Sequence, residues 1–238
     1  MPRRRFLLAC AWGVHLYTAL GAVAGLLAIY FASRWEFRAS FIAMGAATFI
    51  DSSDGPLARL VNVRARVPSF DGALLDNIVD YLTYTVAPVF LMIEAGITPP
   101  GWIGLGLAGF VMLASAYGFC QTAAKTDDHY FLGFPNYWNL IAFYLYCLGR
   151  SPTFNAAILA TFAVLVFVPI KYIYPNRTVA LRPLTLTLGI IWAVITIAML
   201  AMLPSVNPVL LFASLSFIAY YLIASFALHA RSALATLR

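Results

Sequence analysis

The chain alternates long apolar runs with short polar breaks, and this pattern predicts its elements. Eight runs are long enough to form helices, and they lie near residues 8–33, 39–62, 71–95, 101–124, 136–149, 153–172, 184–203 and 207–229. A helix that crosses a bilayer needs about 20 apolar residues, so most of these runs can span a membrane. The run 136–149 is shorter and fits a tilted, broken or cavity-lining helix. We predict an all-α, polytopic membrane protein with about eight transmembrane helices.

The composition supports a membrane protein and argues against a soluble one. Of the 238 residues, 63% are hydrophobic and only 10% are charged, whereas soluble domains typically carry about 25% charged residues. No repeat, low-complexity segment or soluble domain is visible, so we predict a single domain over residues 1–238. The first apolar run follows Arg3, Arg4 and Arg5 but is far longer than the apolar region of a signal peptide, about 7–15 residues. We expect it to be retained as an anchor.

The basic residues predict the topology. If eight helices alternate from an inside N-terminus, twelve basic residues fall on the inside and three, Arg34, Arg38 and Arg150, on the outside. The positive-inside rule then places both termini in the cytoplasm. These loops account for the net charge of +6, and no basic face on a soluble domain remains for a nucleic acid. The scattered histidines, His15 and His229 among them, predict no site.

Five of the nine acidic residues lie in the stretch from Asp51 to Asp80. An acidic group at mid-bilayer costs on the order of 2.5–3.5 kcal/mol, so something positive is expected among them. Asp51 and Asp54 stand at i, i+3, and Asp76 and Asp80 at i, i+4, so each pair shares one helix face. Between the pairs, Pro68 lacks an N–H and should break the helix. The spacing predicts a helical hairpin on which four carboxylates converge.

Four converging carboxylates predict a metal site for phosphoryl transfer. Hard cations take oxygen ligands, and Mg²⁺ is usually held by a few carboxylates together with substrate phosphates. The alternative is a set of helix caps and salt bridges to Arg59, Arg64 and Arg66. For Asp71, which lies off the shared face, helix capping is the favoured interpretation.

The same stretch carries a resemblance to a known family. Two segments, Asp-x2-Asp-Gly-x2-Ala-Arg and Gly-x3-Asp-x3-Asp, resemble the signature of the CDP-alcohol phosphotransferases. All eight fixed residues are present: Asp51, Asp54, Gly55, Ala58, Arg59, Gly72, Asp76 and Asp80. Twelve residues separate Arg59 from Gly72, a longer gap than in most of that family. The long gap resembles the bacterial phosphatidylcholine synthase branch, which joins CDP-diacylglycerol to choline.

The resemblance implies a role for each signature residue. The metal ligands would be Asp51, Asp54, Asp76 and Asp80, holding Mn²⁺ or Mg²⁺, with two ions favoured. Asp80 would also be the base that takes the proton from choline. The CDP moiety would be bound by Asp51, Gly55, Ala58, Arg59 and Gly72, where small residues permit close approach of the nucleotide. The alternative for the small residues is close helix packing, which for Gly72 holds in either case. The resemblance also implies a homodimer in the bacterial cytoplasmic (inner) membrane.

A second polar stretch offers cations for the lipid-side phosphate. Lys171, Arg177 and Arg182 fall on the cytoplasmic side of the predicted topology, among aromatic and turn residues. Arg binds phosphate through its planar fork and Lys as a point charge. We expect one or more of the three to contact the lipid-side phosphate of CDP-diacylglycerol. The alternative is that they only signal topology.

Residues 130–139 contain a Phe-x-Gly-x-Pro core that resembles a segment shared by the phosphatidylserine and phosphatidylcholine synthase branches. A quaternary ammonium donates no hydrogen bond, and proteins hold it over aromatic faces. The predicted choline cage comprises Phe134, Tyr137 and Trp138, with Tyr81 and Tyr84 as contributors from the motif helix. The alternative is an aromatic belt at the membrane surface.

Two other functions stay open. The same chemistry with serine, glycerol phosphate or inositol as acceptor fits the carboxylates equally well, although the aromatic loop favours choline. A cation or proton-coupled transporter would also explain intramembrane carboxylates. It gives no reason for the glycine, alanine and arginine spacings beside them.

Overall fold

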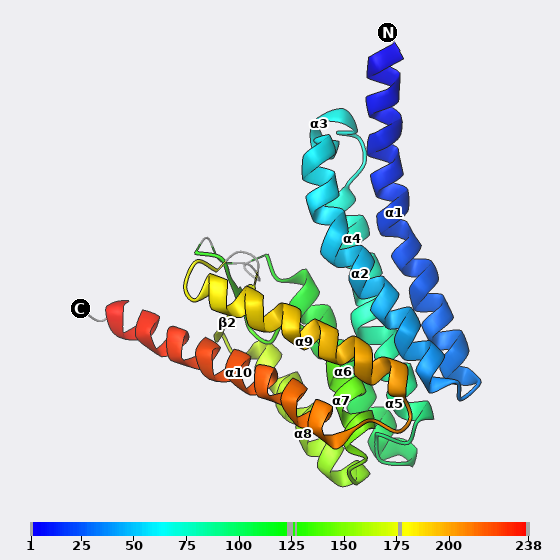
Figure 1. Cartoon of the computed structure of the whole chain (residues 1–238), viewed down its shortest axis with the longest axis vertical. Helices are drawn as coiled ribbons and strands as arrows, with labels where there is room; N and C mark the ends of the chain where they lie inside the picture. The colour runs from blue at the N-terminus through cyan, green and yellow to red at the C-terminus, as the bar shows by residue number, and fades with distance from the viewer. Residues whose placement is uncertain (1, 123–125, 127, 176–177, 237–238) are drawn as a thin grey trace. The chain divides into compact units, whose positions relative to one another are not determined.

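The computed structural model describes residues 2–122, 126, 128–175 and 178–236, which are mostly helical (Figure 1). The helices are α1 Pro2–Ser33, α2 Phe37–Val61, α3 Val63–Arg66, α4 Gly72–Asp80, α5 Ala87–Glu94, α6 Gly101–Cys120, α7 Trp138–Leu148, α8 Pro152–Phe167, α9 Arg182–Met202 and α10 Pro208–Thr236. A π-helix, η1 Tyr81–Val86, joins α4 to α5. Two short strands, β1 Tyr130–Leu132 and β2 Lys171–Ile173, pair with each other.

Each of the eight predicted runs contains helix, so the all-α class is confirmed, whereas the count of about eight transmembrane helices stays a prediction. Among the described residues, four helices are long and apolar enough to cross a membrane: Arg4–Ser33, Gly101–Cys120, Arg182–Met202 and Pro208–Ser232. Two shorter apolar helices, Trp138–Leu148 and Pro152–Phe167, accompany them. The C-terminal half of α2 carries Asp51, Asp54 and Arg59, so it is less apolar than these spans.

The prediction of helix over 153–172 is wrong at its C-terminal end. Helix α8 stops at Phe167 and Val168 is extended, with φ −88° and ψ 123°. The ring of Pro169 disfavours the helical region for the residue before it, which explains the stop. The chain then enters β2, which pairs antiparallel with β1 so that Tyr130 lies opposite Ile173.

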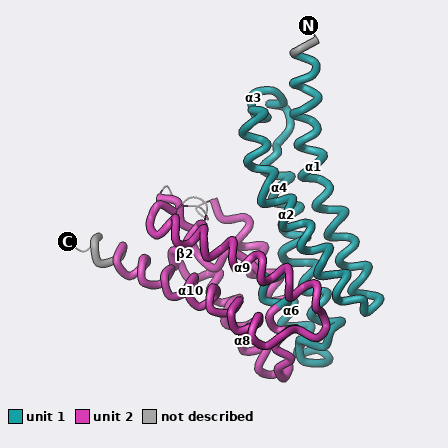
Figure 2. Tube along the Cα trace, viewed as in Figure 1, with its two compact units in different colours: residues 1–108, 138–143 teal, residues 109–137, 144–238 magenta. Residues whose placement is uncertain are grey.

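The contacts of the chain form two compact units (Figure 2). The first comprises residues 1–108 and 138–143, and the second comprises residues 109–137 and 144–238. In the first unit, α1 packs along α2 and also contacts α4 and α5. In the second, α10 packs against α9 and β2.

Helix α4 begins where the sequence predicts a break and a cap. After the short α3, the side chain of Asp71 accepts hydrogen bonds from the backbone N–H groups of Ala73 and Leu74, at 3.1 and 3.0 Å. This is the N-cap arrangement that satisfies the free donors of the first turn. The capping role predicted for Asp71 is confirmed, and the cap starts the helix that carries Asp76 and Asp80.

Candidate metal and substrate site

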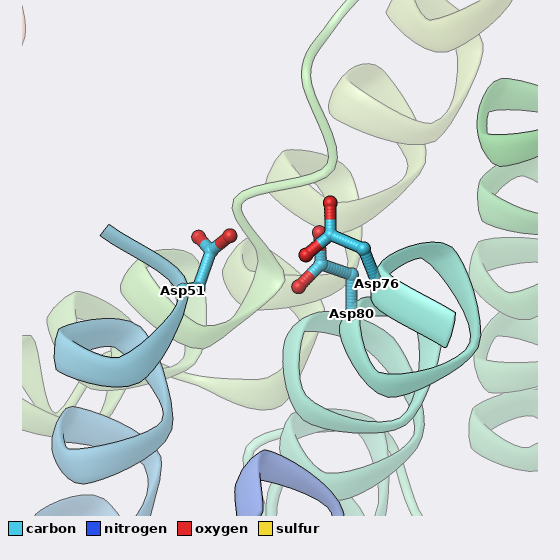
Figure 3. A group of neighbouring side chains, drawn as sticks. All are labelled: Asp51, Asp76 and Asp80. Carbon is cyan, nitrogen blue, oxygen red and sulfur yellow. The ribbon is translucent and has the colours of Figure 1, made fainter. Parts of the chain in front are cut away.

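Three carboxylates from two helices meet in the first unit. Asp51 comes from α2, whereas Asp76 and Asp80 lie one turn apart on α4. Each offers a ligand oxygen, and these atoms lie within 4.8 Å of one another. Figure 3 shows Asp76 and Asp80 side by side, with the carboxylate of Asp51 facing them. The structure thus brings together three of the four carboxylates that the spacing predicts to converge.

The electrostatics of this group favour a bound cation. Two unit charges 4.8 Å apart repel each other by about 3.5 kcal/mol at an effective dielectric constant of 20. All three residues are half-buried, so water screens this repulsion only in part. Carboxylate oxygens are the donors that Mg²⁺ and Mn²⁺ prefer. The residues present therefore fit a divalent metal ion.

Asp54 lies outside this group of three. Its carboxylate is buried, with 7% of the residue exposed, and Oδ2 accepts a hydrogen bond of 2.8 Å from the hydroxyl of Thr18 on α1. A buried carboxylate needs such a donor, since an unpaired one would be costly. The structure therefore gives Asp54 a partner on α1, and its role as a metal ligand stays a prediction.

A tyrosine hydroxyl contacts the carboxylate group directly. Tyr84 lies on η1, four residues after Asp80, and its hydroxyl donates to Oδ2 of Asp51 at 2.6 Å. We predicted Tyr84 as part of a choline cage, on the strength of its ring. The structure adds a polar contact of the hydroxyl that the aromatic argument did not anticipate.

The small signature residues of α2 lie in two different environments. The position of a Cβ on Gly55 would be 3.4 Å from Nη1 of Arg59, so the exposed arginine lies beside this glycine. Ala58 is half-buried and packs against a core cluster that includes Ala11 and Val14 of α1. Ala58 thus has a packing role, and the CDP contacts predicted for Gly55, Ala58 and Arg59 stay predictions.

Gly72 packs against a residue that the sequence argument missed. A Cβ on Gly72 would lie 2.7 Å from Cε1 of His15, so the imidazole occupies the space beside the glycine. The His15 ring also contacts Phe70, with centroids 4.4 Å apart. The packing interpretation of Gly72 is confirmed. The available signal was the spacing on α1, since His15 and Thr18 stand at i, i+3 and contact α4 and α2, respectively.

The second unit contains the cations predicted for the lipid-side phosphate. The ammonium of Lys171 lies 2.6 Å from Oδ2 of Asp128 and 3.2 Å from the hydroxyl of Ser232. The hydrogen bond from Lys171 lowers the pKa of Asp128 below its usual value. Lys171 therefore has protein partners. Arg182 is exposed at the first residue of α9, and Arg177 lies outside the described residues.

The aromatic residues predicted for choline belong to both units. Phe134 and Tyr137 lie in the second, where the buried Phe134 contacts Phe162 with ring centroids 4.7 Å apart. Trp138 lies in the first unit and is 0% exposed. Tyr81 and Tyr84 are half-buried in the first unit, on η1.

Comparison with known proteins identifies the family. No family model matches the chain. A protein named phosphatidylcholine synthase from Legionella pneumophila is 38% identical over 223 residues, covering 91% of this chain and 87% of the relative. A protein of the same name from Legionella bozemanae is 41% identical over 211 residues, which is 86% of this chain and 95% of the relative. The chain belongs to the phosphatidylcholine synthase family.

A more distant member of the phosphatidylcholine synthase family, from Pseudomonas aeruginosa, is 34% identical and covers 85% of both chains. Membership in this family confirms the resemblance drawn from the eight signature residues and the long gap after Arg59. The similarity extends over nearly the whole chain, so it includes the aromatic segment and the second unit as well as the carboxylates. None of these named relatives supports the transporter alternative.

Proposed function

We propose that the protein transfers the phosphatidyl group of CDP-diacylglycerol to choline and releases CMP. The observation that carries this proposal is the meeting of Asp51, Asp76 and Asp80 at signature positions of α2 and α4. The relatives that cover most of the chain are named for the product of this reaction.

The reaction is a displacement at phosphorus. The hydroxyl oxygen of choline attacks the lipid-side phosphorus and forms a new oxygen–phosphorus bond. The bond from that phosphorus to the bridging oxygen breaks, and this oxygen leaves with CMP. Asp80 takes the choline proton as general base. A divalent ion, Mn²⁺ or Mg²⁺, held by Asp51, Asp76 and Asp80 would neutralise charge on the pyrophosphate and on the leaving CMP. The family resemblance favours two such ions, with Asp54 as a further ligand.

Other residues would bind the two substrates. We propose Gly55 and Arg59 as contacts for CDP, in line with the exposed guanidinium beside the glycine. Lys171, Arg177 and Arg182 remain the candidates for the lipid-side phosphate. Of these, Arg182 is exposed and Lys171 already pairs with Asp128.

Choline would bind among aromatic side chains. Phe134, Tyr137, Trp138, Tyr81 and Tyr84 remain the candidates. The complete burial of Trp138 supports a packing role for it beside any contact with choline.

The membrane arrangement is part of the proposal. We propose that the chain crosses the bacterial inner membrane with about eight helices and has both termini in the cytoplasm. We also propose that it works as a single catalytic domain within a homodimer. Support comes from four apolar helices of spanning length among the described residues and from the basic inside loops. The carboxylates of α2 and α4 would then face the side on which nucleotide-linked substrates are made.

CMP release from purified protein in detergent tests the proposed reaction. We would supply CDP-diacylglycerol, Mn²⁺ and, in turn, choline, serine, glycerol 3-phosphate and inositol. CMP released with choline alone, and lost in Asp80→Asn, is expected. The matched control is Asp71→Asn, which changes a nearby carboxylate outside the cluster and keeps a residue that caps helices well.

The possible results separate the acceptor from the chemistry. CMP released with serine or another acceptor instead of choline would overturn the acceptor and keep the carboxylate site. No CMP with any acceptor, from folded protein, would overturn the proposed enzyme.

A further inference from the structure

Tyr84 connects two elements across the carboxylate group. Its hydroxyl donates to Oδ2 of Asp51 at 2.6 Å, and 33 residues separate the two along the chain. Hydrogen bonds to an ionised carboxylate are among the short, strong ones. A carboxylate has about four acceptor positions, so Asp51 keeps capacity for a cation while it accepts from Tyr84.

The backbone that carries Tyr84 is unusual at this place. The π-helix η1 begins at Tyr81, directly after Asp80, and its hydrogen bonds close over one more residue than those of an α-helix. Short π-helical turns within α-helices are rare and occur frequently at functional sites. Thr83 is buried in this turn and donates to the carbonyl of Val79 at 3.0 Å. The wider turn alters where Tyr84 points relative to Asp80.

A second polar contact lies one turn away on α2. Thr48 precedes Asp51 by three residues, so the two share a helix face. The hydroxyl of Thr48 accepts a hydrogen bond of 3.1 Å from Nδ2 of the buried Asn139 at the start of α7. Tyr84 also interacts with Thr48. The tyrosine hydroxyl therefore lies in a polar environment within the first unit that also includes Asn139.

We propose that Tyr84 is a positioning residue for the metal site and acts through Asp51. Its hydroxyl holds the Asp51 carboxylate in one orientation toward Asp76 and Asp80. The proposal rests on the proposed metal-dependent transfer. It assigns Tyr84 to the metal site, whereas the sequence predicted Tyr84 as a choline contact. Partners of this kind typically contribute 10–100-fold to metal affinity or activity.

The affinity for Mn²⁺ tests this role without any turnover. We would titrate Mn²⁺ into detergent-purified protein and follow the free ion by its electron paramagnetic resonance signal. Tyr84→Phe keeps the ring and removes the hydroxyl, and we expect the Kd for Mn²⁺ to rise 10–100-fold. The matched control is Tyr17→Phe, which removes another phenol bonded to α2, through Ser53 at 2.8 Å. It should leave the Kd unchanged.

Equal Mn²⁺ affinity in Tyr84→Phe and the wild type would overturn the proposal, and so would an equal loss in Tyr17→Phe. If Tyr84→Phe is not monodisperse, Tyr84→Met serves in its place. The flexible apolar side chain of methionine then fills the space. The expected rise in the Kd for Mn²⁺ and the results that would overturn the proposal are the same as for Tyr84→Phe.

CMP release supplies the second measurement. In Tyr84→Phe, the Mn²⁺ concentration for half-maximal activity should rise with the Kd, while the KM for choline at saturating Mn²⁺ stays unchanged. A raised KM for choline with unchanged Mn²⁺ affinity would assign Tyr84 to choline and overturn the positioning role. Wild-type protein that binds Mn²⁺ but releases no CMP would refute the proposed function alone, because the Mn²⁺ titration would still decide the role of Tyr84.

Discussion

The imidazole of His15 on α1 lies against the backbone of Gly72, the first residue of α4. A Cβ at Gly72 would lie 2.7 Å from Cε1 of His15, a separation that real Cβ atoms do not show. The histidine is buried, and among the described residues its Nε2 has no hydrogen-bond partner. Glycine at this signature position therefore has a packing reason that is independent of the nucleotide.

Gly72→Ala should destabilise the protein by about 1–3 kcal/mol, because the added methyl overpacks the contact with His15. The loss should be smaller in a His15→Ala background, where the space beside Gly72 is open. Unfolding of the four proteins in detergent measures this coupling. Equal losses in both backgrounds would show that His15 is not what requires glycine at this position.

Thr18→Val should destabilise the fold by about 1–3 kcal/mol, because it leaves the buried carboxylate of Asp54 without its hydroxyl donor. The matched control is Thr161→Val on α8. The exposed hydroxyl of Thr161 bonds only a backbone carbonyl of its own helix, that of Ala157. Unfolding midpoints of both variants give the comparison, and equal effects would argue against a special role for the Thr18–Asp54 bond.

Trp138→Ala should lower stability by about 3–5 kcal/mol, because it removes a large, fully buried side chain. Trp138→Phe, which keeps most of the volume, should lose much less. KM values for choline and for CDP-diacylglycerol, measured on folded fractions, complete the test. Selective loss of choline use in Trp138→Phe with full stability would restore the cage interpretation over packing.

The pair of Asp128 and Lys171 should stabilise the protein at neutral pH and lose this effect in acid. Its lowered pKa means that Asp128 contributes stability above its unfolded pKa of about 3.9 and loses it as the pH falls through the folded value. At neutral pH, Asp128→Asn should unfold at a lower temperature than the wild type. The effect should stay below about 1 kcal/mol for so exposed a pair. Unfolding between pH 7 and pH 2 measures it, and a difference that does not shrink as the pH falls below about 3.9 would contradict the pairing.

The signature carboxylates show how much of the candidate site could be predicted from the sequence. The i, i+4 spacing of Asp76 and Asp80 and the break at Pro68 predict two facing helices, and the structure brings Asp51 to the same place. The spacing does not separate Asp54 from the group, because that depends on Thr18, a partner 36 residues away. The local spacing of residues does not predict a hydrogen-bond partner that is so far away along the chain.

Local sequence patterns did not predict three other features of the structure. The π-helix at Tyr81–Val86 and α5 read as one apolar helix with α4, because the switch from i→i+4 to i→i+5 bonding leaves the composition unchanged. The strands β1 and β2 have three residues each, too few for an alternating pattern. Lys171 was predicted only as a phosphate contact or a topology signal, and its partner Asp128 lies 43 residues away.

The most direct test of the central claim follows the choline oxygen through the reaction. Choline labelled with ¹⁸O at its hydroxyl would be incubated with CDP-diacylglycerol, Mn²⁺ and purified protein, and both products analysed by mass spectrometry. The account predicts that all the label enters phosphatidylcholine and none enters CMP, and that Asp80→Asn forms neither product. Label in CMP, or CMP formed without any labelled phosphatidylcholine, would contradict it.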